Sequence, residues 1–206
     1  WYDDIFSSFP SLPEGGSRQQ GIAPVRLLDT REGAGSVGPG KTIDLQVAGV
    51  KGIPANATAV ALNVTVTGPT SPGYLTVFPA GSGRPDASNL NFQTGQTVPN
   101  MVIAKVGAGG KVSIFNSHGS SHVIVDATAY FEPVESPLGG GELNATEPAR
   151  VLDTREGVGA RTGKVGAGET VTVKVTGEGG VPTMNVDSVV LNVTATDPTS
   201  LGYVTV

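Results

Sequence analysis

The residues best suited to chemistry in this sequence are an aspartate and an arginine that occur together twice. The tetrad Leu-Asp-Thr-Arg supplies Asp29 and Arg31 in its first copy, and Asp153 and Arg155 in its second. A guanidinium fork binds carboxylates, and an aspartate accepts hydrogen bonds from hydroxyl groups, so the pair could contact a ligand. An aspartate at the end of a strand also caps a turn through its carboxylate, with an arginine paired nearby. We favour this structural role and keep the ligand role as the alternative.

Aromatic side chains form the second group of candidates. Tyr74 and Tyr203 occupy equivalent positions in two copies of a longer motif, and a sugar ring can stack on an exposed tyrosine. The simpler interpretation is that both tyrosines pack on a core. The N-terminal segment adds an aromatic cluster that is either a remnant of an adjoining domain or an anchor for a partner's groove. This cluster consists of Trp1, Tyr2, Phe6 and Phe9.

The sequence contains none of the common catalytic motifs. It contains no GxSxG, HExxH or phosphate-loop motif and no cysteine. The two histidines, His118 and His122, flank a short turn without an evident third ligand, whereas a usual metal site needs three or four. Asp86, Asn89 and Asn91 match no calcium-binding loop. We therefore expect a non-enzymatic protein with no catalytic residue, no metal site and no cofactor.

Composition and charge limit the partners. The net charge of −5 argues against nucleic acid, because phosphate binding needs a basic face. No apolar run is long enough for a membrane-spanning helix. Charged residues make up only 15% of the chain, while glycine and proline number 30 and 15. Such a composition is typical of strands joined by turns, with an uncharged surface rich in Thr and Asn.

An internal duplication decides the domain organisation. Residues 24–33 (PVRLLDTREG) recur as residues 148–157 (PARVLDTREG), identical at eight of ten positions. Residues 61–77 (ALNVTVTGPTSPGYLTV) recur as residues 190–206 (VLNVTATDPTSLGYVTV), identical at twelve of seventeen positions. Two matched blocks in the same order indicate that one module is present twice.

Apolar and polar residues alternate within the first copy, as expected of β-strands with one buried face. The alternation predicts strands over residues 42–47, 58–67, 73–78, 98–106, 111–116 and 122–131. The run Met-Val-Ile-Ala at 101–104 predicts a strand that is buried on both faces. About eight short strands separated by Gly and Pro turns favour an all-β fold of antiparallel β-sandwich modules in tandem, with a β-barrel as the alternative.

We divide the chain into four parts. Residues 1–23 form the aromatic tail and a polar tether, 24–131 a complete module, 132–147 a Pro/Gly-rich linker and 148–206 a partial second copy. Half a β-domain would expose an unpaired sheet edge. Either the chain is a fragment of a longer protein, or another chain supplies the missing strands by strand addition.

The ordered motifs of the module resemble a tandem repeat of exported and cell-surface proteins of soil bacteria. The motifs are PVRLLDTR, GIPANATAVALNVTVTGPTSPGYLTVFPAG, SNLNFQTGQTVPNMV and KVSIFNSHGSSHVIVDATAYF. The likeness covers residues 24–131 in full and 148–206 in part. The family closes its repeats with Gly-Tyr-Phe, where this sequence has Ala129-Tyr130-Phe131. The resemblance implies an extracellular location and an accessory, non-catalytic role, and it brings no binding residues with it.

These observations predict an extracellular or cell-surface structural or adhesive protein that assembles with itself into a fibre by strand complementation. The alternative is an accessory module of a secreted hydrolase that binds cell-wall carbohydrate. The expected partner is therefore either another copy of the chain or a cell-surface polysaccharide. An assembled fibre would favour the first hypothesis, and a monomer retained on polysaccharide would favour the second.

Overall fold

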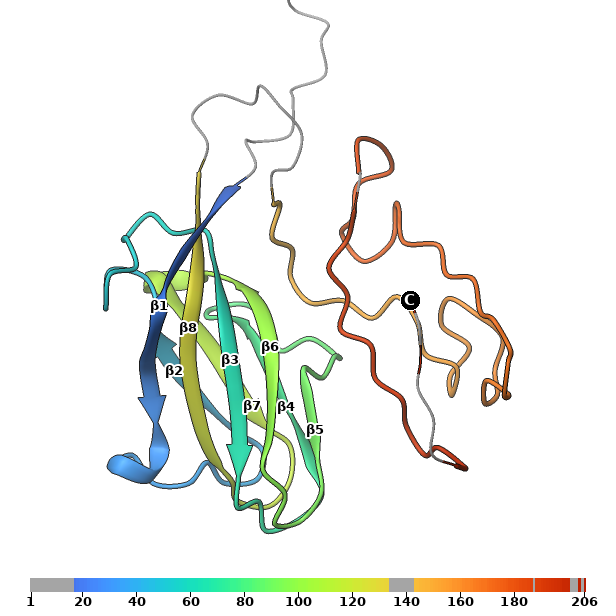
Figure 1. Ribbon diagram of the computed structural model, residues 1–206, viewed down its shortest axis with the longest axis horizontal. Coiled ribbons are helices and arrows are strands. Elements are labelled where there is room, and N and C mark those ends of the chain that lie inside the picture. Colours follow the sequence, from blue (N-terminus) through green and yellow to red (C-terminus); the bar gives the residue numbers. More distant parts are fainter. Residues whose placement is uncertain (1–16, 134–142, 187, 201–203, 205) are drawn as a thin grey trace, which may run out of the picture.

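The computed structural model describes residues 17–133, 143–186, 188–200, 204 and 206. Residues 17–133, here called the first module, form two antiparallel four-stranded sheets packed face to face (Figure 1). The strands are β1 (Ser17–Asp29), β2 (Lys41–Gln46), β3 (Ala59–Thr67), β4 (Gly73–Pro79), β5 (Leu90–Phe92), β6 (Val98–Lys105), β7 (Lys111–Asn116) and β8 (His122–Pro133). This arrangement confirms the predicted all-β antiparallel sandwich and contains no closed barrel.

The strand order gives the module its topology. One sheet has the order β1-β8-β3-β6 and the other β2-β7-β4-β5, so most connections cross from one sheet to the other. This is the order of an eight-stranded jelly roll, in which two Greek keys form the two sheets. Strand β1 is an edge strand next to β8, while β5 and β6 are edge strands at the other side of the sandwich.

The core lies between the sheets and follows from the alternation in the sequence. On β3, the side chains of Val60, Leu62, Val64 and Val66 are fully buried. The strands β4, β7 and β8 supply further inward-facing apolar residues, including Leu75, Val77, Val112, Ile114, Val123 and Val125. Burying each of these side chains contributes roughly 1.5–3 kcal/mol, which allows the first module to form a core of its own.

The first strand starts earlier than the sequence pattern indicates. We placed residues 17–23 in a polar tether, whereas β1 begins at Ser17 and pairs with β8 as far as Pro133. Its first residues are polar because an edge strand buries few side chains, so alternation does not show there. Leu143, placed in the linker, forms an isolated bridge with Ser17. It packs near Phe131 on the outer face of the sheet.

Strand β6 differs from its expected environment. The run Met-Val-Ile-Ala predicted burial on both faces, but only Val102 and Ala104 are buried. Met101 is 67% exposed on the outer face of β6, the last strand of its sheet. The apolar run therefore lies on an edge strand.

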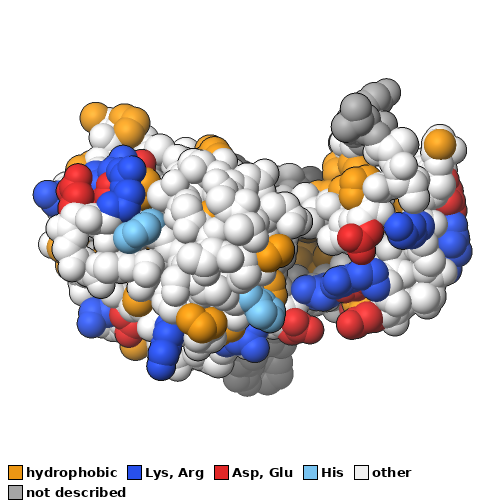
Figure 2. Space-filling model, turned by 90° about the horizontal axis from the view of Figure 1, so that it is seen from below, with side chains coloured by type: hydrophobic (Ala, Val, Ile, Leu, Met, Phe, Trp, Pro, Cys, Tyr) orange, Lys and Arg blue, Asp and Glu red, His pale blue; other side chains and the backbone are white. Residues whose placement is uncertain are grey.

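The described residues of the second repeat contain no strand. They wind beside the first module on the side of β5 and β6 (Figure 1), with one isolated bridge between Asp153 and Val158. Viewed from below, the first module shows a broad uncharged area, with charged side chains toward its periphery (Figure 2). Within the described part of the chain, no helix is long and apolar enough to cross a membrane.

Candidate interaction sites

The first Leu-Asp-Thr-Arg tetrad forms a capped turn where β1 ends. Asp29 is the N-cap of a 3-10 turn over Thr30–Glu32, and its Oδ1 accepts a hydrogen bond from the Arg31 backbone N–H at 3.1 Å. The guanidinium of Arg31 donates to both carboxylate oxygens of Asp29, at 2.9 and 2.6 Å. An aspartate at this position closes the turn because its oxygens satisfy a backbone donor that the turn leaves free.

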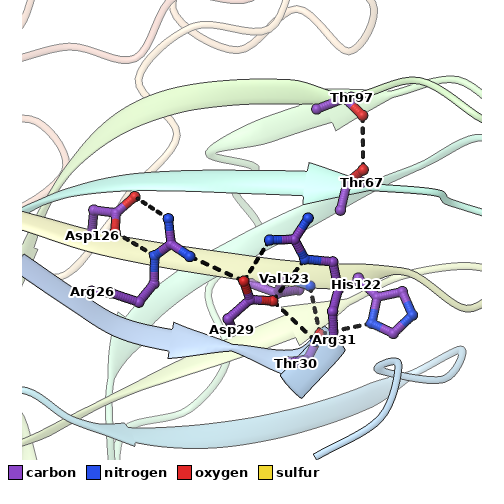
Figure 3. Close-up of polar contacts among 9 residues, drawn as sticks. All are labelled: Arg26, Asp29, Thr30, Arg31, Thr67, Thr97, His122, Val123 and Asp126. Atoms are coloured by element: carbon purple, nitrogen blue, oxygen red, sulfur yellow. Dashed lines mark hydrogen bonds and ion pairs between the residues drawn. The ribbon is translucent and has the colours of Figure 1, made fainter. Parts of the chain in front are cut away.

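Arg26 connects this turn to the neighbouring strand. Its Nη1 donates to Asp29 at 3.0 Å, and its Nε and Nη2 donate to the two oxygens of Asp126 on β8, at 2.5 and 3.4 Å. Figure 3 shows Arg26 and Arg31 on opposite sides of the Asp29 carboxylate. Two arginines and two aspartates thus balance one another, and the cluster offers no excess charge to a charged ligand.

These contacts shift the ionisation of the cluster. The hydrogen bond from the Arg31 side chain is the largest cause that lowers the pKa of Asp29, from 3.8 to about 2. The pKa of Arg31 is raised in return, first by its hydrogen bond to Asp29. Asp29 therefore stays ionised over the whole range in which most carboxylates titrate.

The threonine of the tetrad has a role that the sequence analysis did not assign. Thr30 is almost fully buried, and its Oγ1 accepts a hydrogen bond from the Val123 backbone N–H at 2.9 Å. The same hydroxyl lies 3.1 Å from His122 Nδ1 (Figure 3). Thr30 thereby joins the end of β1 to the beginning of β8. In the sequence, the one sign that Thr30 has a structural role is that it belongs to the duplicated tetrad.

The second tetrad builds the same turn without a sheet around it. Asp153 Oδ1 accepts from the Arg155 backbone N–H at 2.9 Å, and the Arg155 side chain donates to both oxygens at 3.0 and 2.6 Å. Arg150 donates to Asp153 at 2.7 Å, as Arg26 does to Asp29. The hydrogen bond from Arg155 is the main cause of a lowered pKa for Asp153.

Of the aromatic candidates, only Tyr74 lies among the described residues. It is half-buried on β4, and its ring centroid lies 6.1 Å from that of Phe115 on β7. The guanidinium of Arg84 lies 4.4 Å from the centroid of the Phe115 ring, so that ring is partly covered. The packing of Tyr74 beside Phe115 gives no support to the idea that a sugar ring stacks on Tyr74. Carbohydrate binding stays a prediction. Outside the described residues lie Trp1, Tyr2, Phe6, Phe9 and Tyr203.

Many apolar side chains of the second repeat are exposed to solvent instead of packed in a core. Ten large hydrophobic residues are exposed in the described parts of the chain, and Met101 alone belongs to the first module. Val193, for example, is 52% exposed, whereas its counterpart Val64 on β3 is fully buried. The exposed residues of the second repeat are Leu152, Val158, Val165, Met184, Val190, Leu191, Val193, Val204 and Val206.

A second contact site lies where the second repeat meets the edge of the sandwich. Asn192 donates through its Nδ2 to the backbone carbonyl of Ser88 at 2.8 Å and to that of Asn89 at 3.3 Å. Its Oδ1 accepts from Asn100 Nδ2 at 3.1 Å. Sequence analysis did not identify Asn100 or Asn192 as contact residues, because a lone asparagine carries no distinguishing pattern.

Over the described ranges, no three His, Asp or Glu side chains gather where they could hold a metal ion.

Few known proteins are similar to this chain: no family model and no curated protein matches it. Among solved structures, the Tobacco streak virus coat protein dimer is similar at 9% identity, with a TM-score of 0.27. The match covers 63% of this chain and 95% of that chain. A similarity this low carries no argument about function.

Proposed function

We propose that the protein is a non-catalytic structural or adhesive protein that assembles with further copies of itself by strand complementation. The observation that carries the proposal is the difference between the two repeats. The first module buries its apolar strand residues in a complete sandwich, whereas the same motif in the second repeat leaves them exposed. Burial of each such side chain would stabilise an assembly by roughly 1.5–3 kcal/mol.

Strand addition suits this molecule because the interacting segments already have strand sequences. Residues 190–196 (VLNVTAT) match the sequence of β3, which pairs with β6 and β8 in the first module. An extended segment of this kind can add to a free sheet edge through main-chain hydrogen bonds, while its side chains occupy pockets. The first module has such edges at β5 and β6.

A cell-surface location belongs to the same proposal and rests on the resemblance of the repeat to modules of exported proteins. It predicts that protease added to intact producing cells would cleave the protein. Cleavage that requires cell lysis would overturn the proposed location while leaving the assembly proposal standing.

The assembly is tested by light scattering and negative-stain electron microscopy of the full 206-residue chain. We expect a mass that grows with concentration, and fibres or closed oligomers on the grid. Residues 17–133 alone are the matched control, because they contain the eight strands of the described residues and the core between the two sheets. They should stay monomeric. A full chain that remains monomeric at every concentration would overturn the proposal.

A further inference from the structure

The open side of the sandwich forms a groove between the edge strands β5 and β6. Together with the second-repeat residues beside it, the groove has a volume of about 350 Å³. The first module lines it with Asn89, Leu90, Asn91, Val98, Pro99 and Asn100. This lining combines the apolar side chains of Leu90, Val98 and Pro99 with the amides of three asparagines. Edge strands expose unpaired backbone groups, so such a side invites an extended chain.

The polar groups of the groove bind the side chain of an asparagine, Asn192. Asn100 donates to the Asn89 carbonyl at 2.5 Å and to Asn192 Oδ1 at 3.1 Å. The carbonyls of Ser88 and Asn89 accept from the Asn192 amide. A carboxamide has both donors and an acceptor on one planar group. Asn192 uses both, because its Nδ2 donates to the two carbonyls and its Oδ1 accepts from Asn100. An apolar side chain at position 192 would form none of these hydrogen bonds with the Ser88 and Asn89 carbonyls or with the Asn100 amide.

Within one chain this contact is incomplete. Among the described residues, no backbone hydrogen bond joins residues 188–196 to β6. Leu191 and Val193, on either side of Asn192, remain exposed. The segment is thus held by side-chain hydrogen bonds alone, which are worth little where water competes for them.

We infer that the groove between β5 and β6 is the docking site for the segment Leu191–Thr194 of a second copy of the chain. The inference rests on the proposed function and identifies the two surfaces that meet. Each chain carries one such segment and one such groove. The matching segment of the first module, Leu62–Thr65, is already held between β6 and β8. Segment-to-groove contacts are therefore head-to-tail, a geometry that yields open chains unless a ring closes.

Three substitutions to alanine test the contact. Asn100→Ala removes the amide of the groove, and Asn192→Ala removes the amide of the segment. Asn63→Ala is the matched control, because Asn63 occupies the equivalent position on β3 and faces away from the groove. We expect Asn100→Ala and Asn192→Ala each to weaken self-association by roughly tenfold, as the loss of one or two hydrogen bonds does. Asn63→Ala should associate as the unmodified chain does.

Mixing the two defective variants separates contacts between chains from contacts within one chain. The Asn100→Ala chain keeps an intact segment, and the Asn192→Ala chain keeps an intact groove. An equimolar mixture should therefore form dimers that neither variant forms alone at the same concentration. Light scattering measures both results, and thermal unfolding checks that each variant is folded. Asn192→Ala keeps the test valid even if Asn100→Ala fails to fold, because Asn192 lies outside the first module.

The outcomes distinguish the two proposals. An unmodified chain that never associates overturns the proposed function and this inference with it. An unmodified chain that associates, with Asn100→Ala and Asn192→Ala associating equally well, overturns only the groove assignment. Loss of association in both variants without dimers in the mixture would show that the contact lies within one chain.

Discussion

Leu62 and Leu191 occupy the same position in the two copies of one motif, yet Leu62 is completely buried and Leu191 is 42% exposed. Leu62 faces the second sheet from the centre of β3, between β6 and β8. Leu191 lies in a segment without strand partners among the described residues. Closely similar local sequences therefore differ in burial, because burial depends on strands far away along the chain.

Truncating these two leucines should have opposite consequences. Leu62→Ala creates a cavity in the core and should lower the free energy of unfolding by about 2–5 kcal/mol. Leu191→Ala should change it by only about 0.5 kcal/mol, since the residue is exposed, but should weaken self-association. Urea unfolding and light scattering measure the two effects. Equal destabilisation by both substitutions would contradict the different environments of the two residues.

The lowered pKa of Asp29 predicts a specific dependence of stability on pH. The carboxylate titrates near pH 2 in the folded chain and near 3.8 when unperturbed. Its contribution to stability is therefore complete above about pH 4 and is lost as the pH falls through about 2. The carboxyl resonance of Asp29, followed by NMR, should have its midpoint near 2. In Asp29→Asn, the stability lost between pH 4 and 2 should be smaller; an unchanged loss would assign it to other carboxyl groups.

Replacing Thr30 tests the connection between the ends of β1 and β8. Thr30→Val keeps the shape of the side chain but leaves the buried Val123 N–H without its partner, which should cost about 1–3 kcal/mol. Thr30→Ser retains the hydroxyl and is the control. Chemical denaturation of the two variants checks the difference. A serine variant as unstable as the valine variant would assign the loss to the methyl group instead.

Gly107 should tolerate no side chain. A Cβ atom at this position would lie 2.2 Å from the Ala80 backbone nitrogen and 2.3 Å from its carbonyl oxygen. We expect Gly107→Ala to destabilise the module by at least about 1–3 kcal/mol, because the backbone has to move. At Gly83, a Cβ would meet no atom within 4 Å, so Gly83→Ala should be neutral. Comparable melting temperatures for the two variants would refute the close approach.

The aromatic tail offers a different test of assembly. If Trp1 to Phe9 connects one chain to the next, deleting these residues should abolish the oligomers of the full chain while leaving the melting temperature of the first module unchanged. Light scattering and electron microscopy of the shortened chain decide the point. Unchanged assemblies would exclude the tail as the connector and leave the strand segment of the second repeat in that role.

Several features could be predicted from the sequence because they depend on neighbours along the chain. Strand β7 lies over residues 111–116, as the alternation predicted, because each inward residue there meets the same core. The carboxylates of Asp29 and Asp153 accept the same hydrogen bonds from neighbouring arginines in both repeats, although only the first tetrad adjoins a sheet. Their arginine partners stand two and three residues away, so the local sequence suffices to build them.

Tertiary structure decided the features that join distant segments. The pairing of Thr30 with Val123, the salt bridge between Arg26 and Asp126, and the contact of Asn192 with Asn100 have no local signal in the sequence. The run at Met101 predicted a strand correctly, but not that the strand would lie at a sheet edge. Side-chain alternation determines which residues of a strand share a face, whereas the order of strands within the sheets determines which faces and edges are covered.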